Sequence, residues 1–267
     1  MESVKSACAD GTTSDTRSGV LRTFQILRAF RTQKPMMTLS EIARATDLPK
    51  TTVHRFLREL VHNRALEVVD GRYAIGLGVF EIGSLYRGGR LRDLLLPCLE
   101  DLYQITHEVV HLAVLNGHEV VYLDKLRGQE RTEAPSRLGG RMPAYCTGVG
   151  KALLAYAPCE VVEATVEAGL HRRTAQTIVD PAALRVELAQ IRSDGYAVDR
   201  EENTPGVSCV AARVSNRRRE SVAAISVTVP TARFDLQRLA PTVQAMALAA
   251  SRTISNDPLL SGIPGAA

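Results

Sequence analysis

The 267-residue sequence contains no run of apolar residues that approaches the roughly 18 needed to cross a membrane. Its first nineteen residues are polar and lack the apolar segment of a secretory signal peptide. The five cysteines are odd in number and include no Cys-x-x-Cys pair, which fits neither a disulfide framework nor a zinc ribbon. The sequence therefore predicts a cytoplasmic protein with reduced thiols and without a membrane partner, a metal or another cofactor.

The composition is ordinary for a folded chain, with 45% hydrophobic and 23% charged residues, and the length suggests one large domain or two unequal ones. The charge is unevenly distributed: residues 1–90 carry 14 Lys and Arg against 9 Asp and Glu, whereas residues 91–267 carry 19 against 20. Between residues 17 and 72 the count is 11 against 5. Because a concentrated positive field attracts a polyanion, nucleic acid is the leading candidate partner; a solvated basic face without a partner is the alternative.

Three helices are predicted near the N-terminus. Apolar residues at three- and four-residue steps predict the first over residues 20–30. Thr38 and Glu41 have the spacing of a capping box and predict the start of a second helix, which ends near Asp47. A third helix begins at Pro49, a residue that suits a first turn. The short gap between the second and third helices predicts a helix-turn-helix.

The third helix has one apolar and one polar face. Its predicted core residues follow helical spacing and are Val53, Phe56, Leu57, Leu60 and Val61. The other face offers cations and hydroxyls that can reach phosphates and base edges from a major groove. Extended runs at residues 66–69 and 72–75 flank Asp70-Gly71 and predict a hairpin wing. The candidate DNA-binding residues are Thr38, Lys50, Thr51, Thr52, His54, Arg55, Arg58 and Arg72. A plain helical bundle used for protein contact is the alternative.

The segment LSEIARATDLPKTTVHRFLRELVHNRALEVVDGRYAIGLGVFEIG resembles the winged helix-turn-helix and following linker of IclR-type bacterial transcription regulators. The resemblance continues through RLGGRMPAYCTGVGKALLAY and DREENTPGVSCVAARV and covers roughly residues 19–255. It implies a ligand-responsive regulator that binds an operator as a homodimer or a dimer of dimers, and that either represses or activates transcription. Operator reading by one helix per subunit also favours a dimer, since two such helices stand about 34 Å apart on DNA.

The rest of the chain predicts an α+β domain with a largely antiparallel sheet. Strand-like runs occur at residues 109–115, 120–126, 196–201, 208–214 and 222–229, with helices before, between and after them. A helix over residues 77–86 precedes Gly88-Gly89, which we expect to be a flexible hinge. The resemblance implies a GAF-like fold whose sheet cups a small ligand. The expected organisation is a disordered tail (1–16), a winged helix-turn-helix domain (17–76), a linker helix and hinge (77–90), an effector-binding and oligomerisation domain (91–256) and a second disordered tail (257–267).

Two features of this domain favour a small-molecule site. Strand alternation over residues 222–229 places Ser226 and Thr228 on one face, which suggests a cavity; a face covered by a helix is the alternative. Thr147 can cap a helix whose first backbone amides face an anion. A tight turn that binds no ligand is the alternative interpretation of these residues. The segment that contains Gly148 and Gly150 is not a phosphate-binding P-loop. That motif needs Gly at the position of Tyr145 and Ser or Thr at the position of Ala152.

The resemblance implies that the effector contacts are Gly148, Val149, Asp199, Cys209, Ser226 and Thr228. Amides at a helix start favour a carboxylate ligand, whereas an ionised Asp199 repels one unless it is protonated or faces a ligand hydroxyl. We therefore expect an organic acid or a related metabolite that carries both an acceptor and a donor group.

No catalytic residue is expected, because none of the six histidines has a triad-like context and no Gly-x-Ser-x-Gly elbow occurs. An enzyme with Cys209 as nucleophile is the least favoured alternative. The second alternative is a DNA-binding oligomer without an effector. In that case no metabolite changes the operator affinity.

Overall fold

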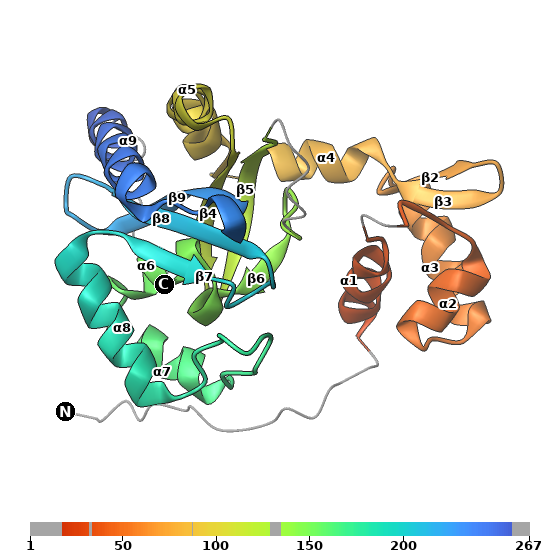
Figure 1. Ribbon diagram of the computed structural model, residues 1–267. Coiled ribbons are helices and arrows are strands. Elements are labelled where there is room, and N and C mark those ends of the chain that lie inside the picture. The colour runs from red at the N-terminus through yellow and green to blue at the C-terminus, as the bar shows by residue number, and fades with distance from the viewer. Residues whose placement is uncertain (1–17, 32–33, 87, 129–134, 258–267) are drawn as a thin grey trace, which may run out of the picture. The chain divides into compact units, whose positions relative to one another are not determined.

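The computed structural model describes residues 18–31, 34–86, 88–128 and 135–257. The chain folds into two compact units, residues 1–86 and 87–267, and each unit has a hydrophobic core of its own (Figure 1). Of the two tails expected to be disordered, all residues except Asp257 lie outside the described residues. No helix in the described segments combines the length and the apolar character needed to cross a membrane.

The first unit contains three packed helices, a small sheet and a fourth helix. Its elements are α1 (Gly19–Ala29), β1 (Met36–Met37), α2 (Leu39–Thr46), α3 (Lys50–His62), β2 (Leu66–Val69), β3 (Arg72–Ile75) and α4 (Leu77–Ser84). The predicted capping box begins α2: Glu41 N donates to Thr38 Oγ1, and Thr38 N donates to Glu41 Oε2 at 2.8 Å. Only residues 47–49 separate α2 from α3, which confirms the helix-turn-helix.

The wing of this unit is a twisted hairpin. Asp70 and Gly71 join β2 to β3 with φ angles of 49° and 71°, both positive as a type I′ turn requires. Strand β1 pairs Met36 with Ala74 and makes a third strand. The sequence did not predict β1, because two residues are too few to show a period. The bundle core consists of Ile26, Met37, Ile42, Ala43, Val53, Phe56, Leu57, Leu60 and Leu66.

The second unit is built on a six-stranded antiparallel sheet with strand order β6-β5-β4-β9-β8-β7. Its strands are β4 (Val109–Asn116), β5 (Glu119–Leu126), β6 (Arg141–Pro143), β7 (Ala197–Arg200), β8 (Val207–Ser215) and β9 (Ser221–Pro230). Its α-helices are α5 (Gly88–Thr106), α6 (Gly148–Leu154), α7 (Cys159–Glu167), α8 (Pro181–Asp194) and α9 (Leu236–Asn256). The predicted α+β class is confirmed.

Helices cover both faces of this sheet (Figure 1). One face packs on α5 and α9 through Val210, Ala212, Ile225 and Val227. The other face packs on α6 and α8 and carries Cys209, Ala211 and Ala224. The alternation that the sequence predicts for β8 and β9 is therefore present, with branched apolar side chains on one face and smaller side chains on the other.

The expected hinge at Gly88 and Gly89 is wrong, because both residues belong to the first turn of α5. The prediction relied on the weak helix propensity of glycine, which helix packing overrides here: Gly88 is buried. Strand β6 was also missed. It pairs Met142 with Val120 over only three residues, again too short to show alternation.

Gly150 marks a close backbone contact at the start of α6. A Cβ atom at this position would overlap the backbone of Ala144 and approach Thr147 Oγ1 to 2.5 Å. The need for glycine at this position therefore comes from packing within the unit.

Gly150→Ala should lower the free energy of unfolding of the second unit by at least about 2 kcal/mol, because a backbone overlap has no flexible neighbour to relieve it. Gly83→Ala is the matched control, since nothing lies within 4 Å of a Cβ added there in α4. It should be neutral or stabilising by up to about 1 kcal/mol. Urea unfolding followed by circular dichroism measures both, and an unchanged midpoint for Gly150→Ala would contradict the packing argument.

Candidate functional sites

The outer face of α3 is open to solvent. Its exposed residues are Lys50, Thr51, His54, Arg55 and Arg58, while Thr52 is half-buried. The guanidinium of Arg55 lies 5.3 Å from the centroid of the Phe56 ring, so its stem follows the bundle surface while its charge stays in water. This face therefore presents donors and positive charge in one direction, away from the bundle core.

Arg72 and Thr38 differ in what they offer a polyanion. Arg72 is the first residue of β3 and is exposed beside the wing turn. The Thr38 hydroxyl donates to Glu41 Oε2 at 3.1 Å and accepts from Glu41 N at 3.3 Å. A phosphate oxygen needs a donor, and the single hydroxyl hydrogen of Thr38 already points to Glu41. Among the candidate DNA-binding residues, Thr38 thus has the weakest geometric support.

A single cavity in the second unit brings together all six residues expected to contact an effector. Its wall includes Gly148, Val149, Asp199, Cys209, Ser226 and Thr228. Strand register explains the grouping, because Asp199, Cys209 and Thr228 are direct neighbours across β7, β8 and β9. The cavity volume is about 30 Å³, which is room for roughly two water molecules.

Helix α6 closes the cavity by lying very near the sheet. A Cβ on Gly148 would stand 2.8 Å from Cys209 Sγ, so glycine is needed for this approach. Thr147 is the N-cap residue of α6, as the sequence predicts, but its hydroxyl does not cap the helix. Its hydroxyl donates to the carbonyl of Pro143 at 3.0 Å and makes no cap bond to α6.

His111 is a cavity residue that sequence reasoning missed. It is buried on β4 directly opposite Ser226. Its Nε2 lies 2.6 Å from Ser136 Oγ, and its Nδ1 lies 3.3 Å from Ser226 Oγ and 3.4 Å from Thr228 Oγ1. Alternation could have placed His111 on the inner face, but only the pairing of β4 with β9 places it beside these hydroxyls. Other lining residues are Tyr122, Pro135, Met142, Thr147, Asn203, Thr204 and Val207.

Burial governs the protonation states in the cavity. Burial and the nearby charge of Glu202 raise the pKa of Asp199 to about 7. Burial, with a smaller effect of Lys125, lowers the pKa of His111 to about 3. Burial and then Asp199 raise the pKa of the Cys209 thiol to about 12. Near neutral pH the cavity therefore contains a neutral imidazole, a protonated thiol and a carboxyl group that is about half protonated.

Comparisons with known proteins identify the family. Residues 19–70 match the IclR helix-turn-helix domain, and residues 87–256 match the family described as bacterial transcriptional regulator IclR C-terminal. The chain belongs to the IclR family. It is a transcription regulator of the IclR type, with a DNA-binding helix-turn-helix unit followed by an effector-binding unit.

Relatives match over most of the chain. The transcriptional regulator BhcR of Paracoccus denitrificans is 38% identical over 82% of this chain and 80% of its own length. The transcriptional repressor IclR of Escherichia coli is 32% identical over 88% of each chain. Among solved structures, an IclR homologue from Microbacterium hydrocarbonoxydans complexed with 4-hydroxybenzoate is 28% identical, with a TM-score of 0.84 over 90% of this chain and 100% of that one.

Cys209 is poorly suited to act as the nucleophile of an enzyme. Its raised pKa keeps the sulfur protonated, and the thiol is a far weaker nucleophile than the thiolate. The relatives named above are transcription regulators. The cavity chemistry thus favours binding by an IclR-type regulator over cysteine catalysis.

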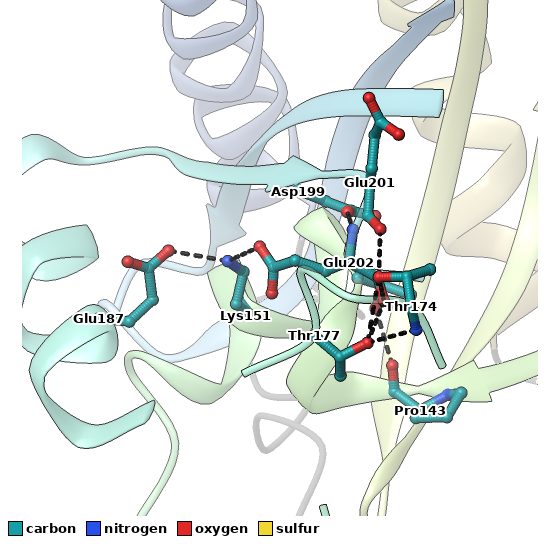
Figure 2. Close-up of polar contacts among 9 residues, drawn as sticks. Pro143, Lys151, Thr174, Thr177, Glu187, Asp199, Glu201 and Glu202 are labelled. Atoms are coloured by element: carbon teal, nitrogen blue, oxygen red, sulfur yellow. Dashed lines mark hydrogen bonds and ion pairs between the residues drawn. The ribbon is translucent and has the colours of Figure 1, made fainter. Parts of the chain in front are cut away.

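A buried ion-pair cluster adjoins the cavity (Figure 2). Lys151 Nζ on α6 lies 2.8 Å from Glu187 Oε1 on α8 and 2.5 Å from Glu202 Oε1. Burial alone would lower the pKa of Lys151, but Glu202 and Glu187 raise it above its ordinary value, so the amine is charged. The backbone N–H of Glu202 donates to Asp199 Oδ1 at 2.7 Å. In this IclR-type chain, Lys151 therefore binds the protein's own carboxylates and connects α6, α8 and the cavity wall.

Asp199 should make stability depend on pH. Its folded pKa lies above its unfolded value of 3.8, so the folded state keeps a proton that the unfolded state releases as pH rises. This contribution favours folding below about pH 4 and is lost as pH rises through 7. Asp199→Asn removes this pH dependence, because the amide stays neutral while its oxygen can still accept from Glu202 N.

Asp199→Asn should therefore be more stable than the wild type at pH 8, on the order of a few kcal/mol, with a smaller difference at pH 5. Urea unfolding at the two pH values measures this. Exposed Asp194→Asn is the control for simple loss of a negative charge. A gain for Asp199→Asn that is the same at pH 5 and pH 8 would count against proton uptake by Asp199.

Proposed function

We propose that this protein binds operator DNA through the outer face of α3 and the wing, and that a short organic acid in the sheet cavity changes its operator affinity. The DNA-binding part of this proposal rests on the solvent exposure of the cations on α3. Thr51, Thr52, His54 and Arg55 face bases or the adjacent phosphates, while Lys50, Arg58 and Arg72 contact phosphate. Thr38 contributes mainly by fixing the start of α2.

The operator is read by a homodimer, alone or as part of a dimer of dimers. Two copies of α3 are needed for specific reading of a site with two half-sites. Helix α4 supports self-association, because its apolar side chains Leu77, Phe80 and Ile82 are 65%, 70% and 75% exposed in the single chain. A run of exposed apolar side chains of this kind is typical of an interface.

Arg55→Ala should weaken operator binding by about 1–3 kcal/mol and relax sequence preference at one base position if Arg55 contacts a base. Binding isotherms on an operator that the wild type selects from random duplexes measure both effects. Arg238→Ala removes an exposed charge from α9 and serves as the control. Wild-type affinity and selectivity in Arg55→Ala would refute the assignment.

The effector-binding part of this proposal rests on the polar groups that surround one small cavity. A carboxylate there faces the Gly148 and Val149 side of the cavity, opposite the hydroxyls of Ser226 and Thr228 and the imidazole of His111. Asp199 is compatible with an anionic ligand when its own carboxyl group is protonated, because the carboxyl group then donates a hydrogen bond. This resolves the conflict between an acidic side chain and an acidic ligand, because a proton enters with the ligand.

Cavity size favours a short acid. A volume of about 30 Å³ holds a few non-hydrogen atoms, far less than the 300–1,000 Å³ typical of sites for larger ligands. The Microbacterium homologue was solved with an aromatic acid, 4-hydroxybenzoate. His111, Tyr122 and Met142 occupy space around the cavity here, so we infer a preference for the smallest hydroxy or oxo acids, those of two or three carbons. Binding then shifts α4 and the spacing of the paired α3 helices.

Short hydroxy and oxo acids should raise the thermal unfolding midpoint of the second unit, whereas 4-hydroxybenzoate should not. Their dissociation constants, measured by calorimetry, should rise about tenfold from pH 6 to pH 8 as Asp199 loses its proton. Asp199→Asn should flatten this pH dependence, and Ser226→Ala should weaken binding at both pH values. Tighter binding of 4-hydroxybenzoate would contradict the size argument, and pH-independent binding would contradict the proton argument.

A further inference from the structure

The turn between β8 and β9 carries three consecutive arginines. Arg217, Arg218 and Arg219 are all exposed at residues 216–220, which we call the arginine turn. Residues 91–267 hold 19 Lys and Arg against 20 Asp and Glu, so without these three arginines the count is 16 against 20. The arginine turn is therefore a concentrated positive charge on a part of the chain that is otherwise acidic.

The backbone of the arginine turn is held firmly. Asn216 is 3% exposed, its N–H donates to the carbonyl of Glu220 at 3.0 Å, and its Oδ1 accepts from the N–H groups of Arg218 and Glu220 at 2.9 and 3.0 Å. From β8, Arg213 Nη1 donates to the carbonyl of Arg219 at 2.9 Å. The three guanidinium groups thus project from a fixed loop, which lowers the conformational entropy lost when they bind a partner.

Within the part of the chain that the structure describes, no carboxylate neutralises these charges. The adjacent carboxylate, Glu220, accepts from Asn216 Nδ2 at 2.8 Å. Across the described residues, no ion pair joins Arg217, Arg218 or Arg219 to a carboxylate. Three adjacent like charges repel one another, and a row of phosphates relieves that repulsion.

The arginine turn lies at the end of the second unit where the chain enters from the first. Ser215 N, just before the turn, donates to Ser251 Oγ on α9 at 2.9 Å. Six residues further along, about 9 Å of helix, Asp257 accepts from Arg90 Nη2 at 2.7 Å. Arg90 lies in the first turn of α5, which begins at Gly88. The entry point of the unit and the arginine turn therefore share one end of the sheet.

We propose that the arginine turn binds the phosphate backbone of the duplex that the first unit holds. This inference rests on the DNA binding proposed above. Residues 76–87 connect the DNA-binding fold to α5, and eight of them form helix α4, so the connection spans at most roughly 25 Å and bound DNA stays within reach of this end of the second unit. The tether gives the contact a high effective concentration, and the acidic remainder of the unit directs the contact to the turn.

The test uses the full chain and random-sequence duplexes of 20 and 60 base pairs. The variant is R217Q/R218Q/R219Q. The matched control, R172Q/R173Q/R238Q, removes the same charge from exposed arginines elsewhere in the second unit. Binding is measured from 50 to 200 mM NaCl. On the longer duplex, the slope of log K against log salt should become shallower by about 1 to 3 in the variant, since each lost phosphate contact removes about 0.9. The control should keep the wild-type slope.

Equal slopes for the variant and the wild type on the 60-base-pair duplex would overturn the proposal. Equal changes in the variant and the control would also overturn it, because they would indicate a long-range field instead of a contact. Loss of binding to phosphatidylserine vesicles with an unchanged DNA slope would assign the turn to lipid and reject DNA. A wild type that binds neither duplex would reject the proposed DNA-binding function itself. A photo-reactive residue at position 218 should cross-link to the longer duplex.

Discussion

The register of β9 between β4 and β8 is the constraint on which the cavity of the second unit depends. It places Thr228 opposite Cys209 and Ser226 opposite His111, and Cys209 in turn stands opposite Asp199. A slip of one residue would turn both hydroxyls toward α5 and α9 and put branched apolar side chains into the cavity. The apolar face of β9, packed on α5 and α9, prevents this slip, because Ile225 and Val227 are fully buried there. Packing on one face of the sheet thus fixes the chemistry of the other.

The buried charges beside the cavity form one connected system. Lys151 neutralises much of the charge on Glu187 and Glu202, and Glu202 in turn influences the ionisation of Asp199. A buried amine without these partners would be strongly destabilising, so α6, α8 and the segment after β7 are held together. Figure 2 shows how this segment is also bound by Thr174 and Thr177, whose hydroxyls donate to the carbonyls of Glu201 and Glu202. A change in the protonation of Asp199 therefore acts on groups that connect several elements.

Charge is divided between the two units according to what each one binds. The helix-turn-helix unit concentrates positive charge on the exposed face of α3, where Phe56 supports Arg55. The second unit keeps the imidazole of His111 and the thiol of Cys209 neutral, which suits a small ligand whose charge must be matched locally. The arginine turn of the second unit differs from the cavity, since its charges are exposed to solvent. Exposure favours long-range attraction to a polyanion, whereas burial favours selective recognition.

The sequence by itself determined those features that arise from neighbours along the chain. The capping box of Thr38 and Glu41, the tight wing turn at Asp70-Gly71 and the alternation of β9 are local, and the residues that form them are visible in sequence. The resemblance to IclR-type regulators supplied the six expected effector contacts, which line one cavity. Tertiary structure decided what depends on contacts between distant segments. These are the place of His111 beside Ser226, the helical start at Gly88, the diversion of Thr147 to Pro143 and the pairing of Lys151 with Glu187 and Glu202. Each follows from strand register or helix packing, which join residues that no spacing in the sequence relates.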